Sequence, residues 1–101
     1  MKSLITNLNK AFENRIRLGI MSVLMVTDWV DFREMKEKLD VTDGNLASHA
    51  AALEKIGFIR VRKSFIGKKP NTAFSVTDEG RKAFKEHLNA LESLIRNNEN
   101  L

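Results

Sequence analysis

The stretch Thr42 to Ile59, TDGNLASHAAALEKIGFI, decides the fold, because it contains a helix start, a helix stop and the beginning of a strand. The hydroxyl of Thr42 can accept a free backbone N–H of the first turn, and Asp43 adds negative charge at the positive end of the helix dipole. Gly57 stands where a left-handed residue ends a helix at the lowest cost. The pattern predicts a helix over residues 43–56.

This helix has two unlike faces. Leu46, Ala50 and Leu53 recur at i, i+4 and i+7, which is the spacing of a buried stripe, and Ile56 extends it. The opposite face holds only small or polar side chains, namely Gly44, Ser48, Ala51 and Lys55, flanked by Asn45 and Ala52. Such a helix can bury one face and lay the other against a flat partner. Our hypothesis is that the partner is DNA.

Further helices are predicted before this stretch. Residues 3–12 have apolar side chains at helical spacing, and Asn14 can cap a second helix that runs to about residue 27. Residues 29–31 are long enough only for an edge strand, and residues 32–39 form a short helix. A short helix, a connection of about three residues and a second helix make a helix-turn-helix.

A β-hairpin and a long helix are predicted after it. The segments 58–65 and 72–76 alternate apolar and polar residues, and the loop 66–71, IGKKPN, separates them, with Pro70 ending the pairing. The last helix starts at residues 77–79 and runs to about residue 97. Its apolar stripe consists of Phe84, Leu88, Leu91, Leu94 and Ile95.

Positive charge is concentrated on the hairpin. The net charge is only +4, but between residues 55 and 77 there is no acid, while six residues are basic: Lys55, Arg60, Arg62, Lys63, Lys68 and Lys69. A clustered patch of this kind is the footprint of a phosphate-binding surface. A solvated strand surface explains the charge equally well, so charge alone does not decide between the two.

Composition excludes several classes. The 101 residues, 43% hydrophobic and 30% charged, fit one folded domain. Without cysteine there is no disulfide or thiolate metal site, and His49 and His87 have no ligand spacing around them, so we predict no metal and no cofactor. Ser48 and His49 point about 100° apart on a helix, so we predict no catalytic pair and no enzyme. No apolar run is long enough to span a membrane, and a cytoplasmic location is the expectation.

Several motifs occur in a fixed order along the chain. They are Asp43-Gly44-Asn45-Leu46, Ser48-His49, Leu53-Glu54, Gly57, the hairpin residues Gly67 and Pro70, and Val76-Thr77-Asp78-Glu79-Gly80-Arg81. In this order of elements they resemble the winged-helix DNA-binding domains of MarR and ArsR-type bacterial transcriptional regulators, and more narrowly their small single-domain subfamily. The resemblance covers about residues 14–84. It implies a mainly α fold with a small β-hairpin wing, a winged helix-turn-helix, over a single domain of residues 1–101.

The resemblance also implies a function. That family is homodimeric, with a recognition helix, here 43–56, in the major groove of duplex DNA and a wing, here 58–76, on the backbone or minor groove. The candidate DNA-binding residues are Asn45, Ser48, His49, Lys55, Arg62, Lys68 and Lys69. For His49 a structural hydrogen bond is an equal alternative. Ala51 and Ala52 depart from the family pattern, since neither can hydrogen-bond a base edge, which shifts weight onto Lys55 and the wing.

The two terminal segments, 1–13 and 85–101, are expected to be helices for dimerisation. Together their stripes expose more apolar surface than a monomer ordinarily keeps. The candidate interface residues are Leu4, Ile5, Leu8, Phe12, Leu88, Leu91, Leu94 and Ile95. The alternative is that both segments fold back on their own domain.

Two further alternatives stay open. The first is a winged helix used as a protein-interaction or RNA-binding module, which the Ala51-Ala52 surface favours. The second is a small-molecule effector site lined by Met21, Met25 and Met35, for which core filling is the commoner explanation.

Overall fold

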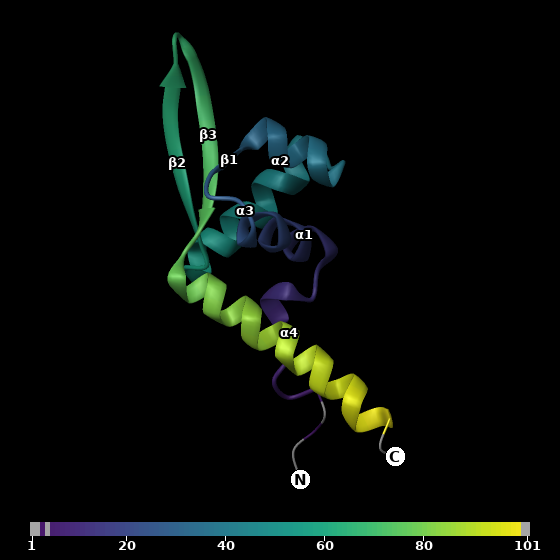
Figure 1. Cartoon of the computed structure of the whole chain (residues 1–101). Helices are drawn as coiled ribbons and strands as arrows, with labels where there is room; N and C mark the ends of the chain where they lie inside the picture. The colour runs from purple at the N-terminus through teal and green to yellow at the C-terminus, as the bar shows by residue number, and fades with distance from the viewer. Residues whose placement is uncertain (1–2, 4, 100–101) are drawn as a thin grey trace.

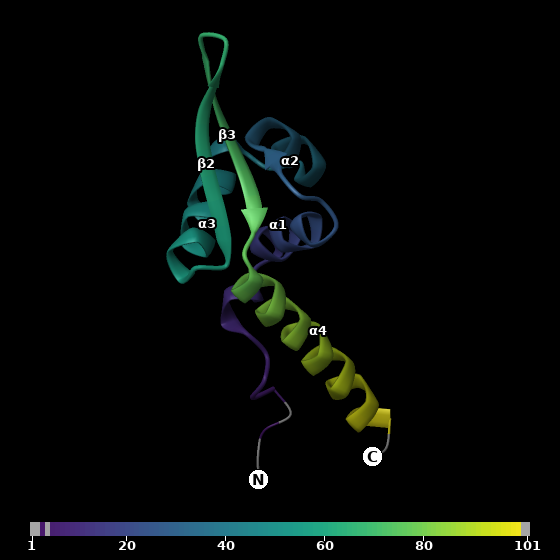
Figure 2. The ribbon, with the colours of Figure 1, turned by 60° about the vertical axis from the view of Figure 1, so that its left-hand side comes forward.

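The helices α1, α2 and α3 pack together beside a small antiparallel sheet, and two projections leave this body in opposite directions (Figures 1 and 2). The computed structural model describes residues 3 and 5–99. In chain order the elements are η1 (Lys10–Phe12), α1 (Arg15–Met25), β1 (Val30–Asp31), α2 (Phe32–Leu39), α3 (Asp43–Ile56), β2 (Ile59–Ile66), β3 (Lys69–Val76) and α4 (Asp78–Glu99). The β2–β3 hairpin, which we call the wing, is one projection and α4 is the other, so the molecule measures 59 × 25 × 21 Å. The predicted winged helix-turn-helix is confirmed.

Side-chain caps define where the helices begin. The Asn14 side chain accepts the backbone N–H groups of the first turn of α1. Asp31 accepts the N–H of Glu34 at the start of α2, at 2.8 Å, and Thr42 accepts the N–H of Asn45 at the start of α3, at 3.1 Å. Each cap satisfies backbone donors that have no partner within the helix. The starts predicted from Asn14 and Thr42 are therefore correct.

The core lies between the three helices and the inner face of the sheet. Ile20, Met21 and Leu24 of α1 are fully buried, as are Met35 of α2 and Phe74 of β3. Leu46, Ala50 and Leu53 supply the stripe from α3, as predicted. The fully buried methionines fill the core, which is the commoner of the two roles considered for them.

The strands of the wing run further than the sequence suggested. The sheet order is β1-β3-β2, and the pairing of β2 with β3 continues from Ile59↔Val76 to Ile66↔Lys69, which leaves only Gly67 and Lys68 in the turn. The predicted loop over 66–71 is thus wrong, because Pro70 does not end the pairing. β1 pairs only with Ala73 and Phe74, so β3 has an open edge at Pro70 where no N–H is needed.

The N-terminal segment differs from the predicted helix over residues 3–12. Residues 5–7 form a turn, and only Lys10–Phe12 is helical, as one 3-10 turn capped by Asn9. A ten-residue helix is not stable by its own hydrogen bonds, so tertiary contacts decide the backbone here. The N–H of Asn9 donates to Nδ1 of His87 on α4, at 3.0 Å. Leu4 lies outside the described residues.

Phe12 is the anchor of this segment. It is 2% exposed and packs on three rings of its own chain, Phe58, Phe84 and His87, with centroid distances of 5.5, 5.2 and 5.3 Å. Its predicted place among the dimer contacts is therefore corrected, because its surface is already used within the domain.

The start of α4 is pressed against the start of β2. A Cβ atom on Gly80 would lie 2.0 Å from the carbonyl oxygen of Phe58, a distance that no side chain can occupy. Thr77 holds the contact from both sides, since its hydroxyl donates to the Gly57 carbonyl at 2.7 Å and accepts the N–H of Gly80 at 2.9 Å. The Thr77-Asp78-Glu79-Gly80 motif is thus explained by a close backbone contact.

We expect Gly80→Ala to destabilise the fold by about 3 kcal/mol, because the added methyl group must displace backbone rather than a flexible side chain. Gly44→Ala is the matched control. Its Cβ would meet nothing within 4 Å on an exposed helical position, so this change should stabilise by up to about 1 kcal/mol. Urea unfolding of both variants measures the difference. Equal stabilities would contradict the close contact.

Candidate nucleic-acid interface

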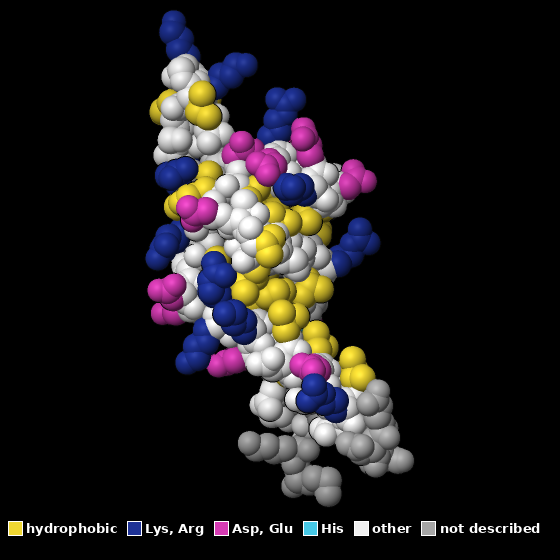
Figure 3. All heavy atoms as spheres, viewed as in Figure 1, with side chains coloured by type: hydrophobic (Ala, Val, Ile, Leu, Met, Phe, Trp, Pro, Cys, Tyr) yellow, Lys and Arg dark blue, Asp and Glu magenta, His cyan; other side chains and the backbone are white. Residues whose placement is uncertain are grey.

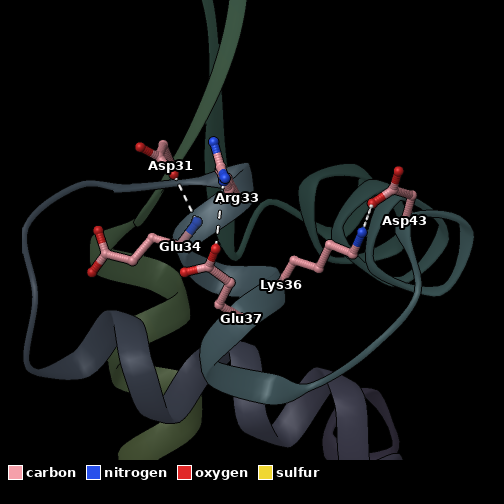
Figure 4. A network of polar contacts seen from close by, with 6 residues as sticks. All are labelled: Asp31, Arg33, Glu34, Lys36, Glu37 and Asp43. Atoms are coloured by element: carbon pink, nitrogen blue, oxygen red, sulfur yellow. Dashed lines mark hydrogen bonds and ion pairs between the residues drawn. The ribbon is translucent and has the colours of Figure 1, made fainter.

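A short turn connects α2 to α3 and sets the orientation of the two helices. Asp40 takes a left-handed backbone conformation, with φ of 52°, and asparagine and aspartate are the residues other than glycine that tolerate it best. Nζ of Lys36 on α2 lies 2.7 Å from the Asp43 carboxylate at the start of α3 (Figure 4). Both side chains are largely exposed, so this ion pair contributes little to stability. Its role is to join the two helices across the turn.

The face of α3 opposite the core is open to solvent. Asn45, Ser48 and Lys55 are exposed along one side of the helix, together with Gly44 and Ala51. Gly44, Ser48 and Ala51 have small side chains, so a flat partner can approach the helix backbone closely along this part of the face. One detail differs from the sequence prediction, because Ile56, expected to extend the buried stripe, is 48% exposed.

His49 lies beside this face and contacts α1. It is half-buried, and its Nδ1 lies 3.2 Å from a guanidinium nitrogen of Arg17. A guanidinium group can only donate, so Nδ1 is the acceptor and the ring proton is on Nε2. Arg17 is itself held by the Ala11 carbonyl, to which its Nε donates at 2.6 Å. Of the two roles predicted for His49, the structure shows the structural hydrogen bond. A DNA contact through Nε2 stays a prediction.

The wing has two faces of different character. Side chains alternate along a strand, and Val61 and Lys63 share the inner face with the residues that pack on α3. Arg60 and Arg62 therefore lie on the outer face. Lys68 is in the two-residue turn at the tip, where Gly67 has φ of 65°, and Lys69 begins the returning strand.

Arg62 is engaged on that outer face. Its guanidinium carbon lies 4.1 Å from the ring centroid of Trp29, which is half-buried rather than part of the core. A cation over an aromatic face is attracted by the ring quadrupole. Arg62 therefore differs from the other candidate residues, because it points away from the recognition helix and already has a partner within the chain.

A shallow groove separates α3 from the inner face of the wing. Its volume is about 250 Å³, and it is lined by Phe32, Ala47, Ala50, Ala51, Glu54, Val61, Lys63, Thr72 and Phe74. The alanines leave the groove open, and its floor is apolar. Glu54 is the acid that lines the groove, and a group of carboxylates lies near α2 (Figure 3). The wing tip in the same view shows only lysine and arginine among its charged groups.

The sequence prediction missed two side chains of this region. Arg17 has no motif around it, and only the fold brings it to His49 across 32 positions of the chain. Phe65 was counted as part of an alternating strand, yet it is 73% exposed on the wing. The sequence feature that could have indicated this exposure is the position of Phe65 next to the turn, at the end of the wing that the helices do not cover.

Among residues 3 and 5–99, no three side chains of the metal-ligating acidic or histidine type are gathered closely enough to hold an ion. Over the same residues, no helix is both long and apolar enough to cross a membrane.

Known proteins resemble this chain over most of its length. A family model described as a winged helix DNA-binding domain matches residues 16–95. The uncharacterized protein MJ0432 of Methanocaldococcus jannaschii is 37% identical over 88 residues, which cover 87% of this chain and 96% of that protein. A transcriptional regulator homologue from Pyrococcus horikoshii OT3 has a similar structure, with a TM-score of 0.82 and 32% identity over 93% of this chain and 91% of that one.

More distant structures share the fold alone. Sco3205 of Streptomyces coelicolor, a MarR family transcriptional regulator solved in complex with DNA, gives a TM-score of 0.67 at 19% identity over 94% of this chain and 68% of that one.

The chain therefore belongs to the family of winged-helix DNA-binding domains, as its motifs predicted. Its class is that of winged-helix transcriptional regulators, with MarR family proteins among its structural neighbours. The family is one of regulators rather than of enzymes.

Proposed function

We propose that the protein is a sequence-specific regulator that binds duplex DNA as a homodimer, with α3 in the major groove and the wing on the backbone or minor groove. One observation carries the proposal. The open, small-residue face of α3 stands next to a wing that has basic residues and no acid from residue 55 to 77. A helix of this shape fits a major groove about 12 Å wide. Sco3205, which shares this fold, was solved in complex with DNA, and this supports DNA as the ligand.

Base reading and backbone binding fall to different elements. Asn45 can pair with adenine, and the hydroxyl of Ser48 can bond several base edges. Ala51 is exposed between them and the groove and can contact only a thymine methyl group. The lysines of α3 and the wing supply the phosphate contacts that give most of the affinity. The domain is thus expected to read few bases and to depend strongly on charge.

A second function is supported by the same alanines. The groove between α3 and the wing has an apolar floor and alanines on its helix side, which suits a protein or RNA partner as well. Binding of duplex DNA at increasing salt, with scrambled-sequence duplex as competitor, separates the two. If scrambled duplex displaces the bound DNA completely, binding does not depend on sequence, and this result would favour the protein-interaction or RNA-binding module.

Two parallel stripes on α4 support the dimer. The first, which contains Ala83, His87 and Ala90, faces the N-terminal segment of the same chain. The second stripe is shifted by one residue along α4. It contains Leu88, Leu91 and Ile95, which are 45%, 36% and 61% exposed. These spacings are those of a helix–helix seam. Leu94 and Leu8 are half-buried and Ile5 is exposed, so they can border the same surface. A second copy is the proposed occupant.

The first test concerns the wing tip. Replacing Lys68 and Lys69 with alanine should weaken binding to every duplex and lower the slope of log affinity against log salt by about one to two units. The matched control is Lys82→Ala with Lys85→Ala, which removes the same charge from exposed positions of α4. A slope changed equally by both pairs would mean that only net charge matters, and an unchanged slope would remove the wing from the interface.

The second test concerns base reading. Asn45→Ala or Ser48→Ala should cost roughly 1–3 kcal/mol on the preferred duplex and less on random DNA, because only the preferred site offers the matching base edge. Ser22→Ala is the control, since this exposed serine of α1 bonds only the Leu18 carbonyl. Equal losses on both duplexes would make Asn45 and Ser48 backbone contacts.

The third test concerns assembly. Leu91→Glu should convert a dimer into a monomer in sedimentation at micromolar concentration, because it buries an unpaired charge in the seam. Lys82→Glu places the same side chain at an exposed position of the same helix, about 180° from Leu91 and about 120° from Leu88, and should leave the dimer intact. A wild-type chain that sediments as a monomer would refute the dimer.

A further inference from the structure

Two large apolar side chains are exposed near the tip of the wing. Phe65 is 73% and Ile66 is 67% exposed, although both lie in β2 and are paired with β3. Figure 3 shows hydrophobic side chains exposed just below the Lys and Arg side chains at the tip of the wing. Burial of either side chain against a partner would remove apolar surface from water, so this part of the wing is a candidate contact.

The two side chains point in opposite directions. Phe65 follows the alternation of Val61 and Lys63, so it lies on the inner face, the one that borders the groove with α3. Ile66 lies on the outer face, as Arg62 does. Only Phe65 is therefore on the side of the wing that a ligand of the recognition helix would meet.

Phe65 has a proline directly opposite it on the neighbouring strand β3. Its register partner is Pro70, which has no N–H, so this pair belongs to the kind that exchanges no hydrogen bonds. In such pairs the side chains approach more closely than in hydrogen-bonded pairs. The register thus places two apolar rings opposite each other on the inner face of the wing, and we call this pair the apolar edge.

The charge around this edge selects the partner. Lys63 precedes Phe65 on the same face, and Lys68 and Lys69 follow it at the tip, without an acid in the whole wing. An apolar side chain beside several cations suits a polyanion that has apolar surfaces within it, and a duplex has these in its stacked base faces, which side chains reach from the minor groove. The edge is also separate from the seam on α4, because the wing and α4 project from opposite ends of the body (Figures 1 and 2).

We propose that Phe65 is an apolar wedge that enters the minor groove and partly unstacks one base step, while the lysines of the wing hold the flanking phosphates. This inference rests on the proposed binding of duplex DNA and adds a contact that reads the deformability of the site rather than its base edges. Apolar wedges act in this way by kinking the duplex, so flexible steps such as TA are favoured.

The test compares Phe65→Ala with Ile66→Ala on a labelled duplex that contains a central TA step. Phe65→Ala should weaken binding roughly tenfold, because it removes the stacking of the wedge without a charge, so the salt slope should stay as in the wild type. Ile66→Ala should leave affinity and slope unchanged. Phe65→Leu, which keeps an apolar wedge, should recover most of the loss. Both side chains are exposed, so thermal unfolding should be alike for all variants.

A structural readout accompanies the affinity. The duplex carries 2-aminopurine at the TA step, and its fluorescence should rise on binding of the wild type and of Phe65→Leu but not of Phe65→Ala. Equal affinities for wild type and Phe65→Ala, with the lysine variants still changing the slope, would overturn the wedge and leave the proposed function standing. A shift of Phe65→Ala from dimer to monomer would overturn it in favour of a second copy. No salt-dependent duplex binding by the wild type would refute both proposals.

Discussion

The hydroxyl of Thr77 is the contact on which the arrangement of this molecule depends. It donates to the carbonyl of Gly57, the residue that ends α3, and accepts the N–H of Gly80 in the first turn of α4. The N–H of Thr77 donates to the carbonyl of Phe58, just before β2. One residue therefore joins the end of the recognition helix, the base of the wing and the start of the C-terminal helix. Because the backbone of Gly80 is pressed on Phe58, these three elements cannot move independently.

This junction determines how assembly would act on DNA binding. The proposed seam on α4 begins about three turns after Thr77, and Thr77 is the single residue between β3 of the wing and α4. If two copies pair along α4, the position of each α3 follows from the pairing without a flexible connection. The spacing of two recognition helices is then a property of the fold, and affinity for a two-part site gains from the rigid link between its halves.

The sequence predicted what local chemistry controls. The caps at Asn14 and Thr42 appear as expected, and so do the three buried residues of the α3 stripe and the alternation over the first four residues of β2. Each of these depends on neighbours within one or two turns. The N-terminal segment did not follow its helical spacing, since the contacts of Phe12 and of Asn9 with α4 outweigh the preference of a short helix. Pro70 was misjudged because its tolerance depends on the length of β1, which is distant in the chain.

The candidate site was likewise predictable where local geometry sets the position of a side chain, and not where distant partners do. The exposed positions of Asn45 and Ser48 follow from helical geometry and the identity of the buried stripe. The side chains that changed role did so through partners far away in sequence, as with Arg17 at His49 and Trp29 at Arg62. Phe65 shows the converse, because its alternation within β2 is that of a core residue, while its place beside the turn leaves it exposed.

Selection of bound sequences from a random duplex pool by the wild-type protein tests the central claim most directly, since it reports binding, specificity and symmetry at once. The account predicts one enriched site made of two inverted half-sites, with centres about 34 Å or one helical turn apart. A pool that binds without enrichment, or an enriched site without two-fold symmetry, would contradict it.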